Sequence, residues 1–220
     1  MQPTRNEWIP EVPEHWTIAR LGFYSTRVGD GLHGTPEYDD SSDIRFINGN
    51  NLRGGEIVDT STTRRVGEEE YGNHKVTLGD TTLLLSINGT IGSVAFYRGQ
   101  KIVLSKSAAY VNLGTELSRE FVFFFVQASP VLNGFIRDAS GTTIPNLSLE
   151  SIRKTWIAIP PDDEQAEIAK YLHEFTTRMN AAEVKVRSTI KFLQEYRTAL
   201  ISAAVTGQID VREEVAASDG

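Results

Sequence analysis

The sequence has no cysteine among its 220 residues. This absence excludes a disulfide scaffold, cysteine-bound zinc, iron–sulfur clusters and a thiol nucleophile. Long apolar runs are also missing: the longest covers residues 121–126, whereas a membrane-spanning helix needs about 20 apolar residues. The first residues show no basic segment followed by an apolar one, so no secretory signal is visible. We therefore expect a soluble cytoplasmic protein without a membrane partner.

Positive charge is in short supply. The chain has 22 Lys and Arg against 29 Asp and Glu, which gives a net charge of −7. Residues 1–160 carry 15 basic and 18 acidic side chains, and residues 161–220 carry 7 and 11, so the surplus acid is not confined to a tail. Proteins that bind nucleic acid usually carry a basic surface. Composition alone therefore argues against DNA binding.

The short motifs of several enzyme classes are absent as well. The chain has no phosphate-binding G-x-x-x-x-G-K-[S/T], no G-x-S-x-G and no H-E-x-x-H. It also lacks Asn/Asp-Pro-Pro-Tyr/Phe, the signature of adenine methylation. The four histidines are scattered, and none has a second histidine at ligand spacing; they are His15, His33, His74 and His173. We expect no catalytic residues and no metal site in this chain.

One nuclease-like pattern is present, Pro161-Asp162 followed by Glu183-Val184-Lys185. A nuclease site of this kind needs its carboxylates within a few ångströms of one metal ion, normally on adjacent strands. Here both carboxylates fall on one predicted helix, about 32 Å apart along its axis. We interpret the match as chance.

The chain changes character at Pro160-Pro161. Before this point, short apolar or β-branched runs alternate with glycine and asparagine, a pattern typical of strands and turns. The expected strands cover residues 44–47, 82–87, 91–97, 101–105, 108–113 and 155–159. A helix is expected over residues 117–127, with a second short one after Pro130 that runs through Arg137. These elements predict a compact α+β domain over residues 1–160.

After the two prolines the pattern predicts a helix over residues 161–207, followed by a flexible tail over residues 208–220. Asp162 can cap the helix, with Gln165 completing a capping-box-like arrangement, and Gly207 supplies the stop. Apolar positions recur at alternating spacings of four and three, with Thr189 the one polar exception. They are Ile168, Leu172, Phe175, Met179, Ala182, Val186, Thr189, Leu193, Tyr196, Leu200 and Ala203. This spacing is the heptad of a coiled coil.

The length of this helix requires a partner. A continuous helix would be about 66 Å long, which is longer than a 160-residue domain is wide. The alternative is two shorter helices that fold back as a hairpin at Asn180-Ala181. We favour one helix, because neither glycine nor proline interrupts residues 163–206. In either arrangement these apolar positions, which form a stripe along the helix, need another helix to cover them, from a second copy or from another protein.

Seven segments follow one another in an order that is typical of one family. They are Val12-Pro-Glu-His-Trp16 with Arg20-Leu-Gly22; Phe46-Ile-Asn-Gly-Asn-Asn-Leu52; Leu78-Gly-Asp80 through Asn88-Gly-Thr-Ile-Gly92; Gly141-Thr-Thr-Ile-Pro-Asn-Leu-Ser148; Ile159-Pro-Pro161 to Glu164-Gln165 with Ile168-Ala169 and Leu172; Arg197-x-x-Leu200-Ile201; and Val205-Thr-Gly-Gln-Ile-Asp-Val211. Together they resemble the specificity (S) subunit of Type I restriction–modification systems, and specifically one half of such a subunit.

The resemblance implies a fold and a function. In the family, two such halves usually stand in tandem, their long helices pack antiparallel as a spacer, and each recognition domain reads one half of a split DNA site. The S subunit is not itself catalytic. It works with methylation (M) subunits, which bind S-adenosylmethionine, and with a restriction (R) subunit. For this chain we expect double-stranded DNA and these subunits as partners, with no cofactor of its own.

A single half requires a second one. We hypothesise that two copies pair antiparallel as a twofold-symmetric homodimer. The helix residues expected at this contact are Ile168, Leu172, Phe175, Met179, Val186, Leu193, Tyr196 and Leu200. The alternative is that the chain is a fragment of a full-length subunit.

The residues expected to contact DNA lie in the polar loops of the first domain. Amides and Arg or Lys suit base edges, while hydroxyls and basic groups suit phosphates. The candidates are His33, Thr35, Asn50, Asn51, Arg53, Arg64, Arg65, Asn88, Lys106, Arg137, Thr142 and Thr143. His33 and Arg53 are the preferred ones. Asn88-Gly89 also fits a simple turn. A coiled-coil scaffold that binds protein and not DNA is the alternative function, and the acidic balance favours it.

Overall fold

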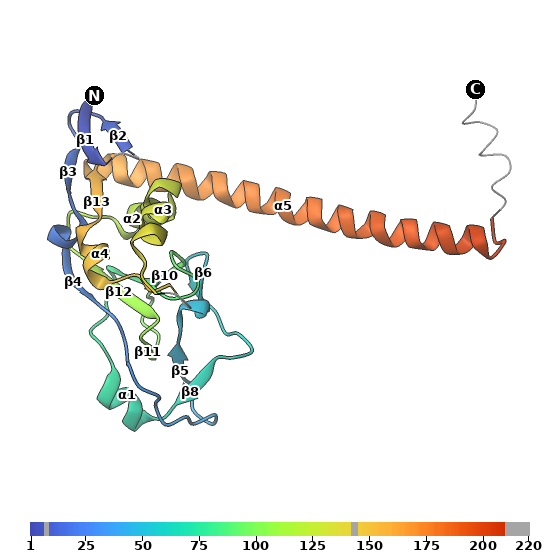
Figure 1. The fold of residues 1–220 in the computed structure, drawn as a ribbon, viewed down its shortest axis with the longest axis horizontal. Helices are drawn as coiled ribbons and strands as arrows, with labels where there is room; N and C mark the ends of the chain where they lie inside the picture. Colours follow the sequence, from blue (N-terminus) through green and yellow to red (C-terminus); the bar gives the residue numbers. More distant parts are fainter. Residues whose placement is uncertain (7–8, 142–144, 210–220) are drawn as a thin grey trace. The chain divides into compact units, whose positions relative to one another are not determined.

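A computed structural model of the chain describes residues 1–6, 9–141 and 145–209. The chain divides into two compact units, Met1–Lys170 and Tyr171–Gly220. The first unit holds all the described strands and short helices (Figure 1). The second unit, where described, is formed by the remainder of the long helix α5 and the turn after it. The functional domain boundaries expected after residues 160 and 207 stay predictions.

Two sheets form the framework of the first unit. The larger is antiparallel and has the order β10 (Val94–Phe96), β9 (Thr82–Ser86), β12 (Ala108–Leu113), β4 (Ser25–Gly29). In the smaller sheet, β5 (Ile44–Ile47) pairs in parallel with β11 (Ile102–Leu104) and antiparallel with β8 (Arg64–Val66). Figure 1 shows β5, β8 and β11 together within the first unit.

Three two-stranded pairs complete the strands. β1 (Gln2–Asn6) forms a hairpin with β2 (Ile9–Val12), and β6 (Leu52–Arg53) pairs with β7 (Glu56–Ile57). β3 (Thr17–Arg20) pairs antiparallel with β13 (Trp156–Ile159), with Arg20 opposite Trp156. This last pair joins the beginning and the end of the first unit. Sequence periodicity does not predict it, because β3 is short and its partner lies far along the chain.

The short helices begin where local sequence provides a cap. The Ser118 hydroxyl accepts a hydrogen bond from Phe121 N at the start of α2, and Ser148 does the same for Ser151 N at the start of α4. Pro130 occupies the first turn of α3, where its missing N–H costs nothing. The short helical elements are η1 (Leu21–Tyr24), η2 (Gly49–Asn51), α1 (Glu68–His74), α2 (Arg119–Gln127), α3 (Ser129–Asp138) and α4 (Leu149–Lys154).

The predicted α+β class is confirmed, and several element boundaries need correction. The strands expected at residues 44–47 and 108–113 are found with those bounds. The strand expected over residues 91–97 begins only at Val94, because Gly92 adopts a positive φ of +88° in a turn before it. The helix expected from residue 117 begins at Arg119, after its serine cap.

The core lies on both faces of β9, whose five residues are all buried. Leu83 and Leu85 face the larger cluster of buried side chains, which includes residues of α2, α3, α4 and β13. Leu84 belongs to a second cluster with Ile47 and Leu104. Because successive side chains of a strand point to opposite faces, these three leucines join the two clusters. The strand therefore has an apolar side chain at each of its three central positions, as expected when both faces are covered.

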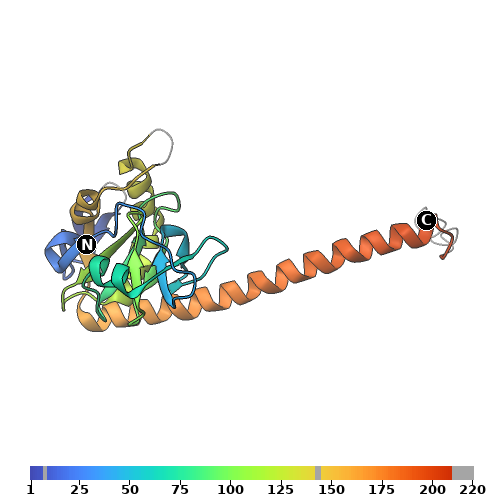
Figure 2. The ribbon, with the colours of Figure 1, turned by 90° about the horizontal axis from the view of Figure 1, so that it is seen from below.

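Helix α5 covers Asp162–Val205 as one element of 44 residues, so the hairpin alternative is wrong (Figure 2). Its first turns belong to the first unit: Ala169 is buried there, and Ile168 contacts the larger core cluster. Hydrophobic residues farther along the helix are exposed. Within the described part of the chain, no helix is both long and apolar enough to cross a membrane.

Gln165 holds the start of α5 to the first unit through a buried amide. Its Oε1 accepts from Ser118 N at 2.8 Å, and its Nε2 donates to Glu116 O at 2.9 Å and to Pro160 O at 3.0 Å. Only 1% of the residue is exposed. The expectation that Gln165 takes part in a capping box is therefore wrong, because its side chain bonds the segments that precede α2 and α5.

Replacing Gln165 by leucine should lower the free energy of unfolding of the first unit by about 1–3 kcal/mol, because the substitution leaves buried backbone groups without partners. Chemical denaturation followed by tryptophan fluorescence measures the effect. Gln127→Leu is the matched control, since Gln127 is exposed and bonds only Phe123 O of its own helix. A Gln165→Leu variant as stable as this control would contradict the role given to the amide.

Candidate nucleic-acid interface

The polar loops singled out in the sequence leave the two sheets at one common end. Ser86, the last residue of β9, lies opposite Ala108, the first residue of β12. Gly29 at the end of β4 lies opposite Tyr110 of the same strand β12. In the smaller sheet, Ile47 and Leu104 are paired at the ends of β5 and β11. The loops that continue from these strand ends are therefore neighbours.

Backbone hydrogen bonds join these loops into one continuous surface. Lys106 N donates to Leu32 O at 2.9 Å, and Ile87 N donates to Ser107 O at 3.1 Å. Leu147 N donates to Ile87 O at 2.8 Å. We call the resulting surface the loop belt and define it as residues 30–35, 48–53, 86–90, 105–107, 140–141 and 145–147. The belt contains the predicted contacts His33, Thr35, Asn50, Asn51, Arg53, Asn88 and Lys106.

Two glycines allow this close approach. A Cβ at Gly31 would lie 1.9 Å from Leu104 O, and a Cβ at Gly49 would lie 2.2 Å from the Ser86 hydroxyl. No side chain fits at either distance, so both positions require glycine. Gly49 N also donates to the Ser107 hydroxyl at 3.0 Å, which ties the turn after β5 to the turn after β11.

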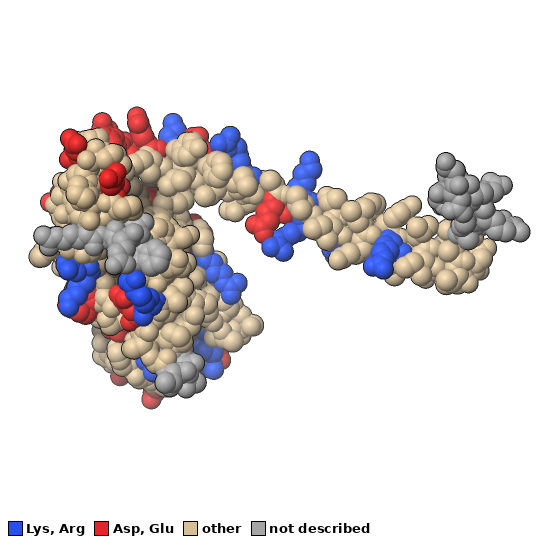
Figure 3. All heavy atoms as spheres, turned by 45° about the horizontal axis from the view of Figure 1, so that its top comes forward, with Lys and Arg blue, Asp and Glu red and all other residues tan. Residues whose placement is uncertain are grey.

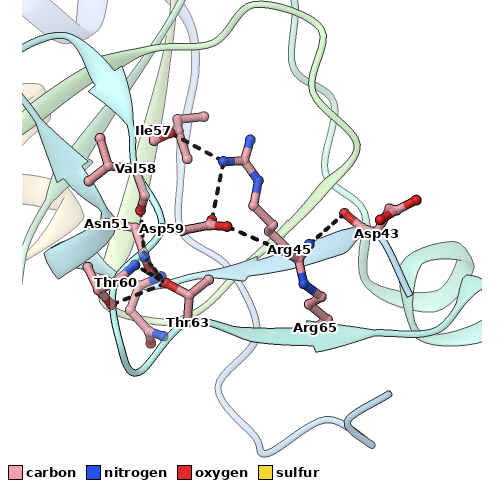
Figure 4. A network of polar contacts seen from close by, with 10 residues as sticks. Asp43, Arg45, Asn51, Ile57, Val58, Asp59, Thr60, Thr63 and Arg65 are labelled. Atoms are coloured by element: carbon pink, nitrogen blue, oxygen red, sulfur yellow. Dashed lines mark hydrogen bonds and ion pairs between the residues drawn. The ribbon is translucent and has the colours of Figure 1, made fainter. Parts of the chain in front are cut away.

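Asn51 is built into the belt and does not project from it. Asn51 is fully buried. Its Oδ1 accepts from Asn48 N at 2.9 Å, and its Nδ2 donates to Val58 O at 2.9 Å and to the Thr63 hydroxyl at 2.6 Å (Figure 4). The prediction that Asn51 contacts DNA disagrees with this placement, because its amide is already engaged inside the fold. Its role is to hold the turn that carries Asn50 and Arg53.

Arg65 is held by an internal network next to this turn. It stands directly opposite Arg45 across β8 and β5, and Asp59 lies between the two cations, 3.3 Å from Arg65 Nη2 and 3.5 Å from Arg45 Nη1 (Figure 4). Arg65 Nη1 also donates to Asp43 O at 3.3 Å. Two like charges in direct cross-strand contact repel each other, and the shared carboxylate offsets this repulsion.

Arg64 is likewise engaged within the chain. Its guanidinium meets both carboxylate oxygens of Asp40 at 3.3 and 3.4 Å and lies over the Tyr38 ring at 4.3 Å. A DNA phosphate would have to compete with Asp40 here. Arg64 and Arg65 stay predicted contacts, although both are less available than their charge suggests.

Arg53 and Lys106 are the exposed cations of the belt without an acidic partner among the described residues. Arg53 donates only through Nε, to Asn50 O at 3.3 Å. Lys106 lies between two serines of the turn that precedes β12. Both side chains can therefore meet an external anion without breaking an ion pair.

The remaining candidates lie in or next to the belt, and their side chains differ in exposure and in the contacts that they already make. The His33 imidazole is 70% exposed and its Nε2 lies 2.8 Å from Asp30 Oδ2. Asn50 donates to the Thr62 hydroxyl, and Asn88 Nδ2 lies 3.5 Å from Asn146 Oδ1. Thr35 is exposed, and Arg137 Nε lies 3.6 Å from Asp138 Oδ1 near the end of α3. Thr142 and Thr143 lie outside the described residues.

Acidic groups accompany the basic ones around the belt. The Asp39 carboxylate accepts hydrogen bonds from the Ser41 hydroxyl at 2.5 Å and from Ser41 N at 3.0 Å, and these bonds lower its pKa below the ordinary value. It therefore stays charged near neutral pH. On the face shown in Figure 3, blue side chains alternate with red ones and with neutral surface. Within the belt, basic charge without an acidic partner among the described residues is confined to Arg53 and Lys106.

Known proteins match both the sequence and the fold. A family model described as "Type I restriction modification DNA specificity domain" matches residues 33–191. The chain belongs to this family. A curated relative is the Type I restriction enzyme EcoBI specificity subunit from Escherichia coli, which is 29% identical over 87 residues, or 39% of this chain and 18% of that protein.

Solved structures of S subunits share the fold. A chain from a study titled "Structural basis underlying complex assembly and conformational transition of the type I R-M system" aligns with a TM-score of 0.67 and 18% identity, over 88% of this chain and 46% of that one. The S subunit from M. genitalium aligns with a TM-score of 0.51 and 18% identity, over 85% and 46%. This chain thus spans just under half the length of these two solved chains.

Arg53→Ala should weaken binding of duplex DNA by about 1–3 kcal/mol, because it removes an unpaired cation from the loop belt. The measurement is a binding titration at fixed salt, with the protein co-purified with a Type I methylation subunit. Lys101→Ala is the control. Lys101 is paired with Glu68 and precedes β11, at the end of the smaller sheet away from Ile47 and Leu104. Unchanged affinity and sequence preference in Arg53→Ala would remove Arg53 from the interface.

Proposed function

We propose that this specificity-domain chain reads one half of a bipartite DNA site through its loop belt and works with Type I methylation and restriction subunits. The observation that carries the proposal is the meeting of distant loops at one end of two sheets in a chain of this family. A rigid framework with polar loops at one end is a common arrangement for recognition.

The limited basic charge fits a shared interface. Arg53 and Lys106 provide local positive charge, while Arg64 is paired with Asp40 and Arg65 shares Asp59 with Arg45. An S-type chain that contacts base edges does not have to supply every phosphate contact, since phosphate contacts position the duplex and base contacts specify it. In this proposal the methylation subunits provide many of the remaining contacts to the DNA phosphates. They also carry S-adenosylmethionine and perform the methyl transfer, and this chain is not catalytic.

We further propose that two copies pair through α5. Six large side chains along its stripe are 44–59% exposed: Phe175, Met179, Val186, Leu193, Tyr196 and Leu200. Apolar surface of this extent is stabilised when a second helix covers it. A twofold-symmetric pair would supply the second recognition domain that one chain lacks. Faces of α5 outside the stripe are then available to the other subunits.

Modified-base sequencing of the host genome with and without the gene tests the recognition proposal. We expect loss of a split adenine-methylation motif when the gene is removed. A palindromic motif would indicate two identical halves, and an asymmetric one would indicate pairing with a different half. If no motif changes, the recognition proposal fails. Salt-dependent DNA binding separates recognition from the alternative of a coiled-coil scaffold, which would show none.

Leu193→Glu should convert the dimer into a monomer, because it places a charge in the centre of the apolar stripe. Light scattering at micromolar concentration gives the mass. Val184→Glu is the matched control: Val184 is 68% exposed and lies off the stripe. It should therefore stay dimeric. A monomeric unmodified chain under these conditions would refute homodimerisation.

A further inference from the structure

Only part of the apolar stripe of α5 is available to a second helix. Ile168 at its start already packs against the core cluster of the first unit, so it is not free for a second helix. The correction applies to Ile168 alone among the residues expected at the dimer contact. The stripe that remains begins at Leu172 and ends at Ala203, and both lie within α5.

We propose that two copies pair antiparallel with their twofold axis between Arg187 and Ser188, so that Met179 lies opposite Tyr196 of the second copy. This inference rests on the antiparallel homodimer proposed above and adds its register. In an antiparallel coiled coil with twofold symmetry, the two kinds of stripe position face each other. Only a few registers satisfy this condition, and neighbouring ones differ by one heptad.

The proposed register uses the whole free stripe. Every stripe residue faces another one; the pairs are Leu172 with Ala203, Phe175 with Leu200, Met179 with Tyr196, Ala182 with Leu193, and Val186 with Thr189. If the axis moved to Val184, Leu200 would face Ile168, which is already packed elsewhere. If it moved to Lys191, Leu172 and Phe175 would lose their partners. Both shifts bury less apolar surface and are disfavoured for that reason.

Flanking charges favour the same register. With the axis at Val184, Lys185 would approach Lys185 of the second copy, and these like charges repel each other. In the proposed register Lys185 instead approaches Phe192 of the second copy. Phe192 is 63% exposed and stacks on Tyr196 with ring centroids 6.5 Å apart. An ammonium over such a ring is attracted to it.

Glu183 is also accommodated in this register. Its Oε1 lies 2.6 Å from Arg187 Nη2 on the same helix, so its charge already has a partner. Its neighbour across the interface would be Ile190, which is 50% exposed. The carboxylate therefore needs no cation from the second copy.

The register has a consequence for DNA. A shift of one heptad changes the distance between the starts of the two helices by about 10 Å. This corresponds to roughly three base-pair steps of 3.4 Å. The register is therefore the variable that would set the spacing between the two half-sites.

Disulfide cross-linking in the full-length chain tests the register, because the natural sequence has no cysteine. Three double variants share Met179→Cys. The second change is Tyr196→Cys for the proposed axis, Thr189→Cys for the axis at Val184, and Ala203→Cys for the axis at Lys191. Non-reducing gels follow the formation of covalent dimer. We expect the pair with Tyr196→Cys to cross-link at least about tenfold faster than the other two, because only there do the sulfur atoms come within bonding reach.

Met179→Cys alone is the control for orientation. In the proposed register it lies about 26 Å from its own copy and should not cross-link, whereas a parallel pair would cross-link it readily. Fastest reaction of the Thr189 or Ala203 pair would overturn the register and leave the antiparallel dimer standing. Cross-linking of the single variant would overturn both the register and the orientation. A monomeric mass by light scattering without any cross-link would overturn the homodimer itself.

Discussion

The burial of strand β9 on both faces is the constraint on which the rest of the first unit depends. Leu84 packs on one side and Leu83 and Leu85 on the other, so both core clusters require this strand in one register. A slip by one residue would exchange the two faces and break both clusters. With β9 fixed, β12 and β10 are fixed by pairing with it. The turn that follows β9 and the turn that precedes β12 then have to meet at one end, where Ile87 N donates to Ser107 O.

Internal ion pairs decide how much positive charge this end presents. Arg45 and Arg65 share the single carboxylate of Asp59, and Arg64 pairs with Asp40. These pairs hold the edges of the smaller sheet while leaving Arg53 and Lys106 free. A net negative chain can therefore present local positive charge at its loops, and total charge is a poor guide to the binding surface of this protein.

Within the described part of the chain, the long helix α5 is packed only at its start. Its start is fixed by the buried amide of Gln165 and by Ala169, whereas the large side chains of its stripe after Leu172 are exposed among the described residues. Most helical stability in proteins comes from packing of the apolar face. The uncovered face is the observation behind the proposed homodimer, and the free length of the stripe together with its flanking charges is the reason for the register that we propose.

Local patterns in the sequence determined the elements. The heptad predicted one continuous α5, and β-branched runs predicted β5 and β12, because periodicity and turn residues act over a few neighbours. The family could also be identified from motif order, and the family match bears this out.

Only the tertiary structure decided which polar residues are available. Asn51 and Gln165 look like surface amides in the sequence, yet both are buried as hydrogen-bonding centres. Arg53 and Arg65 are equivalent candidates in the sequence, yet only Arg65 lies within ion-pair distance of Asp59. The pairing of β3 with β13 likewise joins residues more than a hundred positions apart. These outcomes depend on partners brought together by folding, and no local pattern encodes the identity of a distant partner.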